Sequence, residues 1–222
     1  MRLSFAFALA AAGLAMPAAA TKVLVPKSDA PIAETRRYFT TDPDAPTLGP
    51  KTADVTVVIY TDYQCPYCRK GAPALLELAK RDPKVQILFR DWPIFGKESV
   101  NAARFAIGSK YQGKYVPFHM ALMKEPRPLS AERIRAAATK AGVDWARLNA
   151  DMKTHQDDII DLVMRNHEQG EILDFTGTPG YLIGNFQHFG EMSLQSLLET
   201  VREARAKAKG LPTTVRKSRK KS

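Results

Sequence analysis

An apolar run that ends just before a pair of cysteines places the strongest constraint on how this chain can fold. Residues 53–61 are mostly β-branched or aromatic and carry a single charge, a composition typical of a strand buried on both faces of a sheet. Cys65-Pro66-Tyr67-Cys68 follows after a short gap. Proline is favoured at the first position of a helix, where its missing N–H costs nothing. The segment therefore predicts a buried strand that leads into a helix capped by Cys65.

The predicted position of Cys65 gives the two thiols different chemistry. The positive end of a helix dipole favours a thiolate, so the pKa of Cys65 is expected to fall below the free value of about 8.5. Cys68 lies one turn later on the same face, within disulfide reach. We expect Cys65 to be the exposed, attacking sulfur and Cys68 the covered, resolving one. Arg69 and Lys70 add to the effect if they point toward Cys65, whereas Asp62 is expected to face solvent without a catalytic role.

Periodic patterns arrange the rest of the chain around this segment. A helix follows the cysteines, with Pro73 as a kink, and residues 85–89 read as a second strand. Apolar spacings of three and four then indicate about four or five helices up to residue 170. Gly184-Asn185 is a hairpin connection between two further strands, before a last helix. The order is βαβ, a helical insertion, then ββα, in an α/β fold. The predicted helix boundaries are the N-caps Ser130, Asp144 and Ser193 and the ends Gly142 and Gly170.

The two ends of the chain differ in composition from its middle. Residues 1–20 have the basic start, apolar centre and small-residue end of a secretory signal, which predicts export to the periplasm or beyond. Most of the net charge of +10 lies at the other end, so the nearly neutral body gives no reason to expect nucleic acid as a partner. The basic end is expected to be disordered and could contact an anionic surface. The predicted parts are a signal peptide (1–20), an N-terminal extension (21–52), a core (53–96 and 171–206), a helical insertion (97–170) and a basic tail (207–222).

The cysteine pair also admits interpretations other than redox chemistry. A disulfide between residues so close in sequence removes little chain entropy, so it is poorly placed to stabilise the fold. The same spacing occurs in half of a zinc site, but a second ligand pair is missing. We therefore expect a redox pair that needs no metal and no organic cofactor. The histidines are scattered, at His119, His155, His167 and His188.

Residues 55–69, which contain the Cys-Pro-Tyr-Cys sequence, resemble the active-site segment of the DsbA-like thioredoxin-fold family of bacterial disulfide oxidoreductases. Gly177-Thr178-Pro179 agrees as well, because this family places a cis-proline opposite the cysteines, just after its helical insertion. The similarity runs from about Phe39 to Ala206. Further matching features are Asp42-Pro43-Asp44, Gly49, Pro73 and Gln112-Gly113-Lys114.

This resemblance implies a thioredoxin-like fold with an inserted helical domain. It also implies that the Thr178-Pro179 bond is cis and faces the cysteines, which would leave the Thr178 backbone free to pair with a substrate strand. Cys65 and Cys68 are then the candidate catalytic residues, and Thr178 and Pro179 the candidate substrate-binding residues. The alternative interpretation of Thr178-Pro179 is an ordinary turn, which the glycines on either side favour. One departure is Ile59, where many relatives carry a buried glutamate that assists proton transfer from Cys68.

The function implied by the motif is that of a disulfide oxidase. A substrate thiolate opens the Cys65–Cys68 disulfide, forms a mixed disulfide at Cys65, and a second substrate thiol releases it. The substrates would be exported proteins with cysteines, and an unidentified redox partner would restore the disulfide of a monomeric enzyme. A disulfide isomerase or reductase is the first alternative, because Thr178 before the proline is shared with isomerases. A non-catalytic module that binds metal or peptide is the second.

Overall fold

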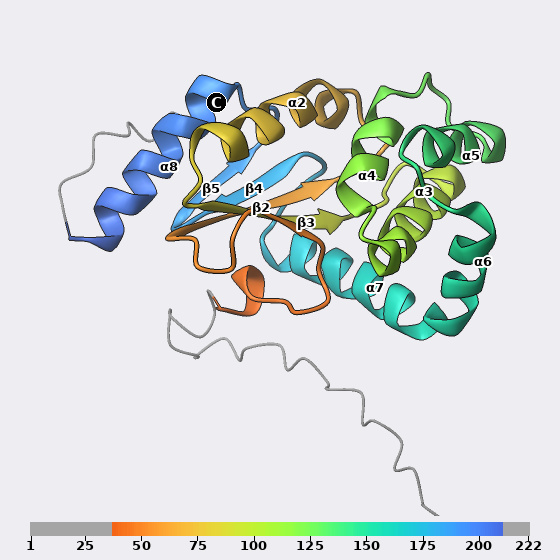
Figure 1. The fold of residues 1–222 in the computed structure, drawn as a ribbon. Coiled ribbons are helices and arrows are strands. Elements are labelled where there is room, and N and C mark those ends of the chain that lie inside the picture. Colours follow the sequence, from red (N-terminus) through yellow and green to blue (C-terminus); the bar gives the residue numbers. More distant parts are fainter. Residues whose placement is uncertain (1–36, 211–222) are drawn as a thin grey trace, which may run out of the picture.

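A computed structural model describes residues 37–210, and a mixed five-stranded sheet lies at its centre (Figure 1). The strands follow the order β1-β3-β2-β4-β5 across the sheet. Only β2 and β3 are parallel, and their register pairs Val55 with Val85 and Thr61 with Asp91. The other pairs are antiparallel. The strands are β1 (Thr47–Leu48), β2 (Val55–Thr61), β3 (Val85–Asp91), β4 (Gly180–Ile183) and β5 (Phe186–Phe189).

Helices cover both faces of this sheet. In Figure 1, α2 and α8 lie on one face, α7 lies on the other, and the remaining helices form a block at the end of β3. After β1, the sequence order is βαβ, helices, ββα, which confirms the predicted thioredoxin-like fold with an inserted helical domain. The helices are α2 (Pro66–Arg81), α3 (Lys97–Gly108), η1 (Ser109–Gln112), α4 (Tyr115–Lys124), α5 (Ala131–Lys140), α6 (Trp145–Thr154), α7 (Gln156–Ile172) and α8 (Leu194–Ala208).

Local signals placed most helix boundaries correctly. The side chain of Ser130 accepts a hydrogen bond from the Arg133 N–H at 3.3 Å, and that of Asp144 accepts one from the Arg147 N–H at 3.0 Å. Ser193 caps α8 in the same way. A Ser or Asp at this position satisfies an N–H that has no partner within the helix, so the cap is encoded locally.

The predicted helix end at Gly170 is wrong, because α7 continues to Ile172. A Cβ atom at position 170 would lie 3.0 Å from the Trp92 indole, so this glycine allows the helix to approach the end of β3. Its role is close packing and not helix termination. The chain turns at Asp174 instead, whose φ of 53° is left-handed.

The second half of the predicted N-terminal extension (21–52) packs on the core. Strand β1 pairs with β3, and the side chains of Tyr38 and Phe39 are buried. Arg90 of β3 is fully buried and forms an ion pair with Asp42. Residues 37–52 therefore belong to the folded unit.

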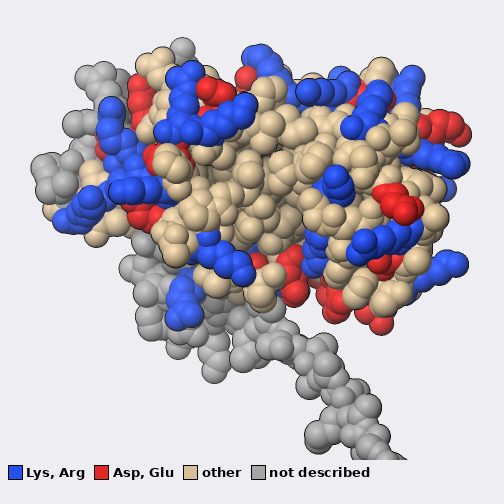
Figure 2. Space-filling view, viewed as in Figure 1, with Lys and Arg blue, Asp and Glu red and all other residues tan. Residues whose placement is uncertain are grey.

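Helix α8 continues through Lys207 to Ala208, past the predicted start of the tail at residue 207. The expected signal peptide, residues 21–36 and the rest of the basic tail lie outside the described residues. Within residues 37–210, charged side chains of both signs are spread around the face shown in Figure 2, with an uncharged area across its middle. No helix in the described part is long and apolar enough to cross a membrane.

Candidate active site

The two cysteines lie where β2 gives way to α2. Cys65 is the N-cap of α2, with extended backbone angles of φ −70° and ψ 121°, and Pro66 takes the first helical position. The backbone N–H of Cys68 points at the Cys65 sulfur at 3.5 Å. The sulfur therefore occupies the place of a capping oxygen, at the end of the helix where N–H groups converge.

This position separates the two thiols in acidity. Hydrogen bonds from the Cys68 side chain and from the N–H groups of Cys68 and Tyr67 lower the pKa of Cys65 to about 6, against the opposing effect of burial. Burial raises the pKa of Cys68 well above its usual range, and its contact with Cys65 adds to that rise. Cys65 is therefore the thiolate at neutral pH and Cys68 the thiol.

The basic residues after the pair do not produce this effect. The guanidinium of Arg69 donates to the backbone carbonyls of Tyr63, at 2.9 Å, and Leu122, at 3.2 Å. Lys70 forms an ion pair with Glu191. Both side chains are engaged elsewhere, so the low pKa of Cys65 follows from hydrogen bonds at the helix end.

The expectation that Cys65 is exposed is wrong for the structure described here. Both cysteines are free thiols, and Cys65 is only 1% exposed, against 4% for Cys68. The loop that carries Thr178 lies over Cys65 and accounts for the difference from the prediction. Cys65 helps to line a groove on the surface.

The Thr178-Pro179 bond is cis and lies against the cysteines, which confirms the predicted placement. The Cys65 sulfur lies 3.1 Å from the backbone carbonyl oxygen of Thr178, and it donates a hydrogen bond to this oxygen when it is protonated. Strand β4 begins only at Gly180, so Thr178 lies just outside the sheet ladder. Within residues 37–210, the buried hydroxyl of Thr178 has no hydrogen-bond partner. A second cis bond, Arg127-Pro128, was not predicted.

Apolar side chains surround the groove beside Cys65. Its volume is about 660 Å³, and its walls come from the start of α2, the loop before α3, the Thr178 loop and the end of β5. Four of these apolar side chains are exposed next to one another. Such a continuous exposed apolar patch is typical of a contact surface. The exposed members are Tyr67 (59%), Ile94 (37%), Phe95 (49%) and Phe189 (52%).

Asp62 holds one wall of the groove in place. Its side chain was expected to face solvent, but it is buried. Its buried carboxylate accepts hydrogen bonds from the Ile94 N–H, at 2.7 Å, and the Phe95 N–H, at 3.0 Å. The hydroxyl of Ser99 and the N–H of Gln64 donate to the same carboxylate, each at 2.7 Å. Asp62 thus ties the loop before α3 to the cysteine segment, which gives it a positioning role.

A second buried acid lies at the end of β3. Tyr115 donates a hydrogen bond to the Asp91 carboxylate at 2.9 Å. Burial raises the pKa of Asp91 to about 7, whereas the Tyr63 hydroxyl nearby opposes that rise. The hydrogen-bond geometry of Tyr63 pairs it with His119 at 3.0 Å, and burial lowers the pKa of that imidazole to about 3. Ile59 is buried and apolar.

No pattern in the sequence indicates the groove or the burial of Asp91. Phe95 and Phe189 are ordinary apolar residues in sequence, and only the fold shows that they stay exposed. The described residues contain no cluster of three or more histidine, cysteine or acidic side chains able to hold a metal ion.

A cysteine pair at the start of a helix, at the end of a central strand and against a cis-proline loop, defines the class of thioredoxin-fold oxidoreductases. The family model for the DSBA-like thioredoxin domain matches residues 56–202. The chain belongs to this family.

Solved structures agree with this assignment over most of their length. A thioredoxin-like oxidoreductase from Silicibacter pomeroyi DSS-3 is 34% identical and superposes with a TM-score of 0.72, covering 77% of this chain and 97% of that one. A periplasmic thioredoxin-like protein from Salmonella enterica serovar Typhimurium is 28% identical, with a TM-score of 0.69 over 77% and 95%. The thiol-disulfide exchange protein alpha-DsbA2 from Wolbachia pipientis is 27% identical, with a TM-score of 0.73 over 78% and 92%.

Curated sequence relatives are much longer than this chain. A protein named Na(+)/H(+) antiporter NhaA 1 from Mycobacterium sp. (strain KMS) is 24% identical over 178 residues, which cover 79% of this chain and 28% of the antiporter. NhaA 3 from Salinispora tropica is 28% identical over 182 residues, covering 77% and 26%. The chain thus spans about a quarter of the length of these relatives.

Proposed function

We propose that this protein is a thiol-disulfide oxidase that introduces disulfides into exported proteins. The observation that carries the proposal is the stabilised Cys65 thiolate, whose pKa lies near 6 because hydrogen bonds converge on the helix cap. A stabilised thiolate favours the reduced form of the pair, and a disulfide whose reduced form is stabilised is a strong oxidant. The same feature supports Cys65 as the sulfur that reacts with substrates.

The proposed reaction begins when a substrate thiolate attacks the Cys65 sulfur of the disulfide. The Cys65–Cys68 bond breaks, a mixed disulfide forms at Cys65, and Cys68 leaves. A second thiolate of the substrate then attacks its own sulfur in the mixed disulfide and releases the Cys65 thiolate. The substrate gains a disulfide and the enzyme pair takes up two electrons. A low pKa makes Cys65 a good leaving group in this last step.

The groove supports a substrate class of unfolded polypeptides. Four exposed apolar side chains beside Cys65 suit an extended segment with apolar residues near its cysteine. The Thr178 carbonyl, which lies 3.1 Å from the Cys65 sulfur, and the Thr178 N–H offer backbone groups to such a segment. We therefore propose Thr178 and Pro179 as substrate-binding residues.

We further propose a periplasmic or otherwise exported location, on the basis of the signal-like residues 1–20 and a periplasmic structural neighbour. The oxidase would act as a monomer and would depend on a redox partner with a disulfide to restore its own. The basic residues after Gly210 provide charge for contact with an anionic surface.

A reductase or isomerase is the competing candidate, and the reduction potential separates it from an oxidase. Equilibration with glutathione buffers should give a value nearer about −120 mV than about −270 mV. A value near the lower end would contradict the oxidase proposal. The variant Cys65→Ser separates an enzyme from a peptide-binding module. An oxidase should lose its function with this variant, because disulfide transfer needs the sulfur. A peptide-binding module should keep its function, because peptide binding in the groove does not need it.

A further inference from the structure

The connection between α4 and α5, residues 125–130, lies beside the active-site segment. The Leu129 N–H donates to the side-chain oxygen of Gln64 at 3.0 Å, and the Gln64 amide donates to the Phe95 carbonyl at 2.9 Å. Gln64 directly precedes Cys65, and Phe95 forms part of the groove wall. The Gln64 side chain therefore places this connection next to both the cysteine segment and the groove.

Three arginines around the connection are held by backbone carbonyls. Arg127 donates to the Gln64 carbonyl at 2.9 Å, and Arg133 donates to the carbonyls of the two prolines in the connection. Arg69 is held in the same way, by the two carbonyls described above. A carbonyl fixes the position of a guanidinium but does not neutralise its positive charge. Within residues 37–210, none of the three arginines forms an ion pair with a carboxylate.

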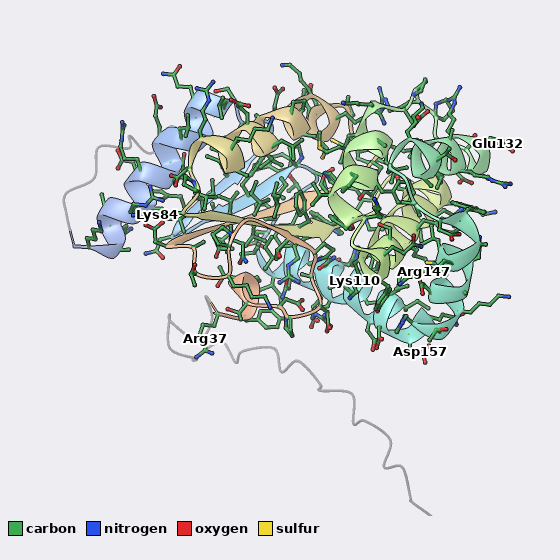
Figure 3. All side chains as sticks on the ribbon, in the orientation of Figure 1. Arg37, Lys84, Lys110, Glu132, Arg147 and Asp157 are labelled. Carbon is green, nitrogen blue, oxygen red and sulfur yellow. The ribbon has the colours of Figure 1, made fainter. Side chains whose placement is uncertain are left out.

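The acids nearest in sequence do not neutralise these arginines. Glu125 is buried and forms its ion pair with Lys140. Figure 3 shows Glu132 at the outer edge of the molecule. Burial, followed by the like charge of Arg127, lowers the pKa of Arg69, so these two guanidiniums lie close enough to repel each other. The connection therefore carries an excess of positive charge that is available to an anionic partner.

We propose that Arg127 and Arg133 bind acidic side chains of the polypeptide whose cysteine reacts with Cys65. The inference rests on the proposed function, because this polypeptide is the substrate of the same groove. Arg127 is exposed and Arg133 is partly exposed, and a guanidinium can donate two parallel hydrogen bonds to one carboxylate. Next to the end of β5, Glu191 lines the groove and is paired with Lys70, so no such excess of charge exists there. Acids are therefore attracted to the connection and not along the whole groove.

A polypeptide is the partner that fits both the charge and the groove. The groove is apolar and suits an extended chain, and Arg127 contacts the residue that precedes Cys65. An extended chain spans about 3.3–3.6 Å per residue, so acids within about four residues of the substrate cysteine reach the guanidiniums. A flat anionic membrane surface would neutralise the same charges without using the groove. The expected substrate class is thus a polypeptide with Asp or Glu close to its cysteine.

The test compares two synthetic substrates that differ only in charge. Both peptides have a pair of cysteines and the same apolar residues, with Asp residues around the cysteines in one peptide and Lys residues in the other. At low ionic strength, the oxidised wild-type protein should oxidise the Asp peptide with the higher kcat/KM. Arg127→Gln combined with Arg133→Gln should lower the ratio of the two kcat/KM values about tenfold, because opposite charges steer and hold the substrate. The effect should nearly vanish in about 1 M salt, where the screening length is about 3 Å.

A matched control removes the same amount of positive charge elsewhere. Arg147 and Lys84 lie well away from the connection between α4 and α5 (Figure 3), and Arg147→Gln combined with Lys84→Gln should leave the ratio unchanged. Arg127→Lys combined with Arg133→Lys should retain most of the ratio, because the charge remains. Loss of the carbonyl contacts alone would slow the oxidation of both peptides alike, so a merely structural role would not move the ratio.

Binding of cysteine-free versions of the two peptides, with Ser in place of Cys, tests the site without electron transfer. The dissociation constant of the Asp version should rise about tenfold when Arg127 and Arg133 are both replaced by Gln. An unchanged constant and ratio, or an equal loss in the control with Arg147 and Lys84 replaced, would overturn the proposal. So would a loss of binding to phosphatidylglycerol vesicles while both peptide values stay unchanged, because the arginines would then serve a membrane surface.

The binding measurement also separates this proposal from the proposed function. If neither peptide is oxidised but the charge preference in binding persists, the oxidase proposal fails and the acid-binding site stands. If both peptides are oxidised at rates that do not depend on Arg127 and Arg133, the oxidase proposal stands and the acid-binding site fails.

Discussion

At the scale of single residues, one sulfur atom serves both the fold and the chemistry. The Cys65 sulfur accepts the Cys68 N–H as the cap of α2 and also has the lowered pKa. The sequence predicted this pairing of roles because capping depends only on adjacent residues. It could not predict that the Asp91 carboxylate is buried against Tyr115, because this hydrogen bond joins β3 to α4 only in the folded chain.

The lowered pKa of Cys65 links the stability of the reduced protein to pH. The folded-state pKa of about 6 lies below the unfolded value of about 8.5, so this group contributes stability above the unfolded value and loses it as pH falls through 6. The melting temperature of the reduced wild type, minus that of reduced Cys65→Ser, should therefore rise from pH 5 to pH 8.5. The comparison removes contributions from Asp91 and other groups common to both proteins. If this difference in melting temperature does not change with pH, the folded structure does not stabilise the Cys65 thiolate.

At the scale of elements, the parts that sequence predicts well are those whose cause is local. Ser130, Asp144 and Ser193 start helices because each side chain satisfies its own helix end. Gly170 was misread because its cause is an indole from another element. The groove could not be predicted from sequence for the same reason, since its walls come from four separate segments.

The groove should matter for polypeptides and not for small thiols. Replacing Phe95 and Phe189 together by serine removes two half-exposed rings, and the lost apolar contact should lower kcat/KM for an unfolded cysteine-containing protein about tenfold. Oxidation of glutathione, which is too small to fill the groove, should proceed at the wild-type rate. Met164→Ser, at an exposed position on α7, is the matched control and should change neither rate. Equal losses for both substrates would mean that the rings act on the cysteines and not on the peptide.

At the scale of the whole molecule, the segment before the first predicted strand is tied to the centre of the fold. Strand β1 is only two residues long, too short to leave a pattern in the sequence. The buried guanidinium of Arg90 reaches across to Asp42 and to the Phe39 carbonyl. Sequence alone could not show which side chain binds Asp42, because Arg90 lies far along the chain and meets it only in the folded protein.

Asp42→Asn should destabilise the protein by about 3–5 kcal/mol, because Arg90 would keep a buried charge without its counter-charge. Burial alone would raise the pKa of Asp42, but Arg90 and Arg165 lower it to about 2. The contribution of Asp42 to the free energy of unfolding is thus complete above the unfolded pKa of about 3.9, and it is lost as pH falls toward 2.

Urea unfolding of both proteins at pH 7 and pH 3 measures this effect, and the gap between them should narrow at the lower pH. The control Asp44→Asn removes an exposed carboxylate that contacts Arg165, and it should cost less than about 1 kcal/mol. A similar cost for the two variants would show that the Asp42–Arg90 pair is not the main contact.

The helical insertion joins the sheet at two points that both border the groove. The chain enters it just after Ile94 and Phe95 and leaves it, after α7, just before Thr178. The opposing walls are thus the two stems of one inserted unit. A change in how that unit packs, even at a helix far from the sulfur, would widen or narrow the opening between its stems. A substitution in the insertion can therefore change the width of this opening while it leaves the Cys65–Cys68 segment itself unaltered.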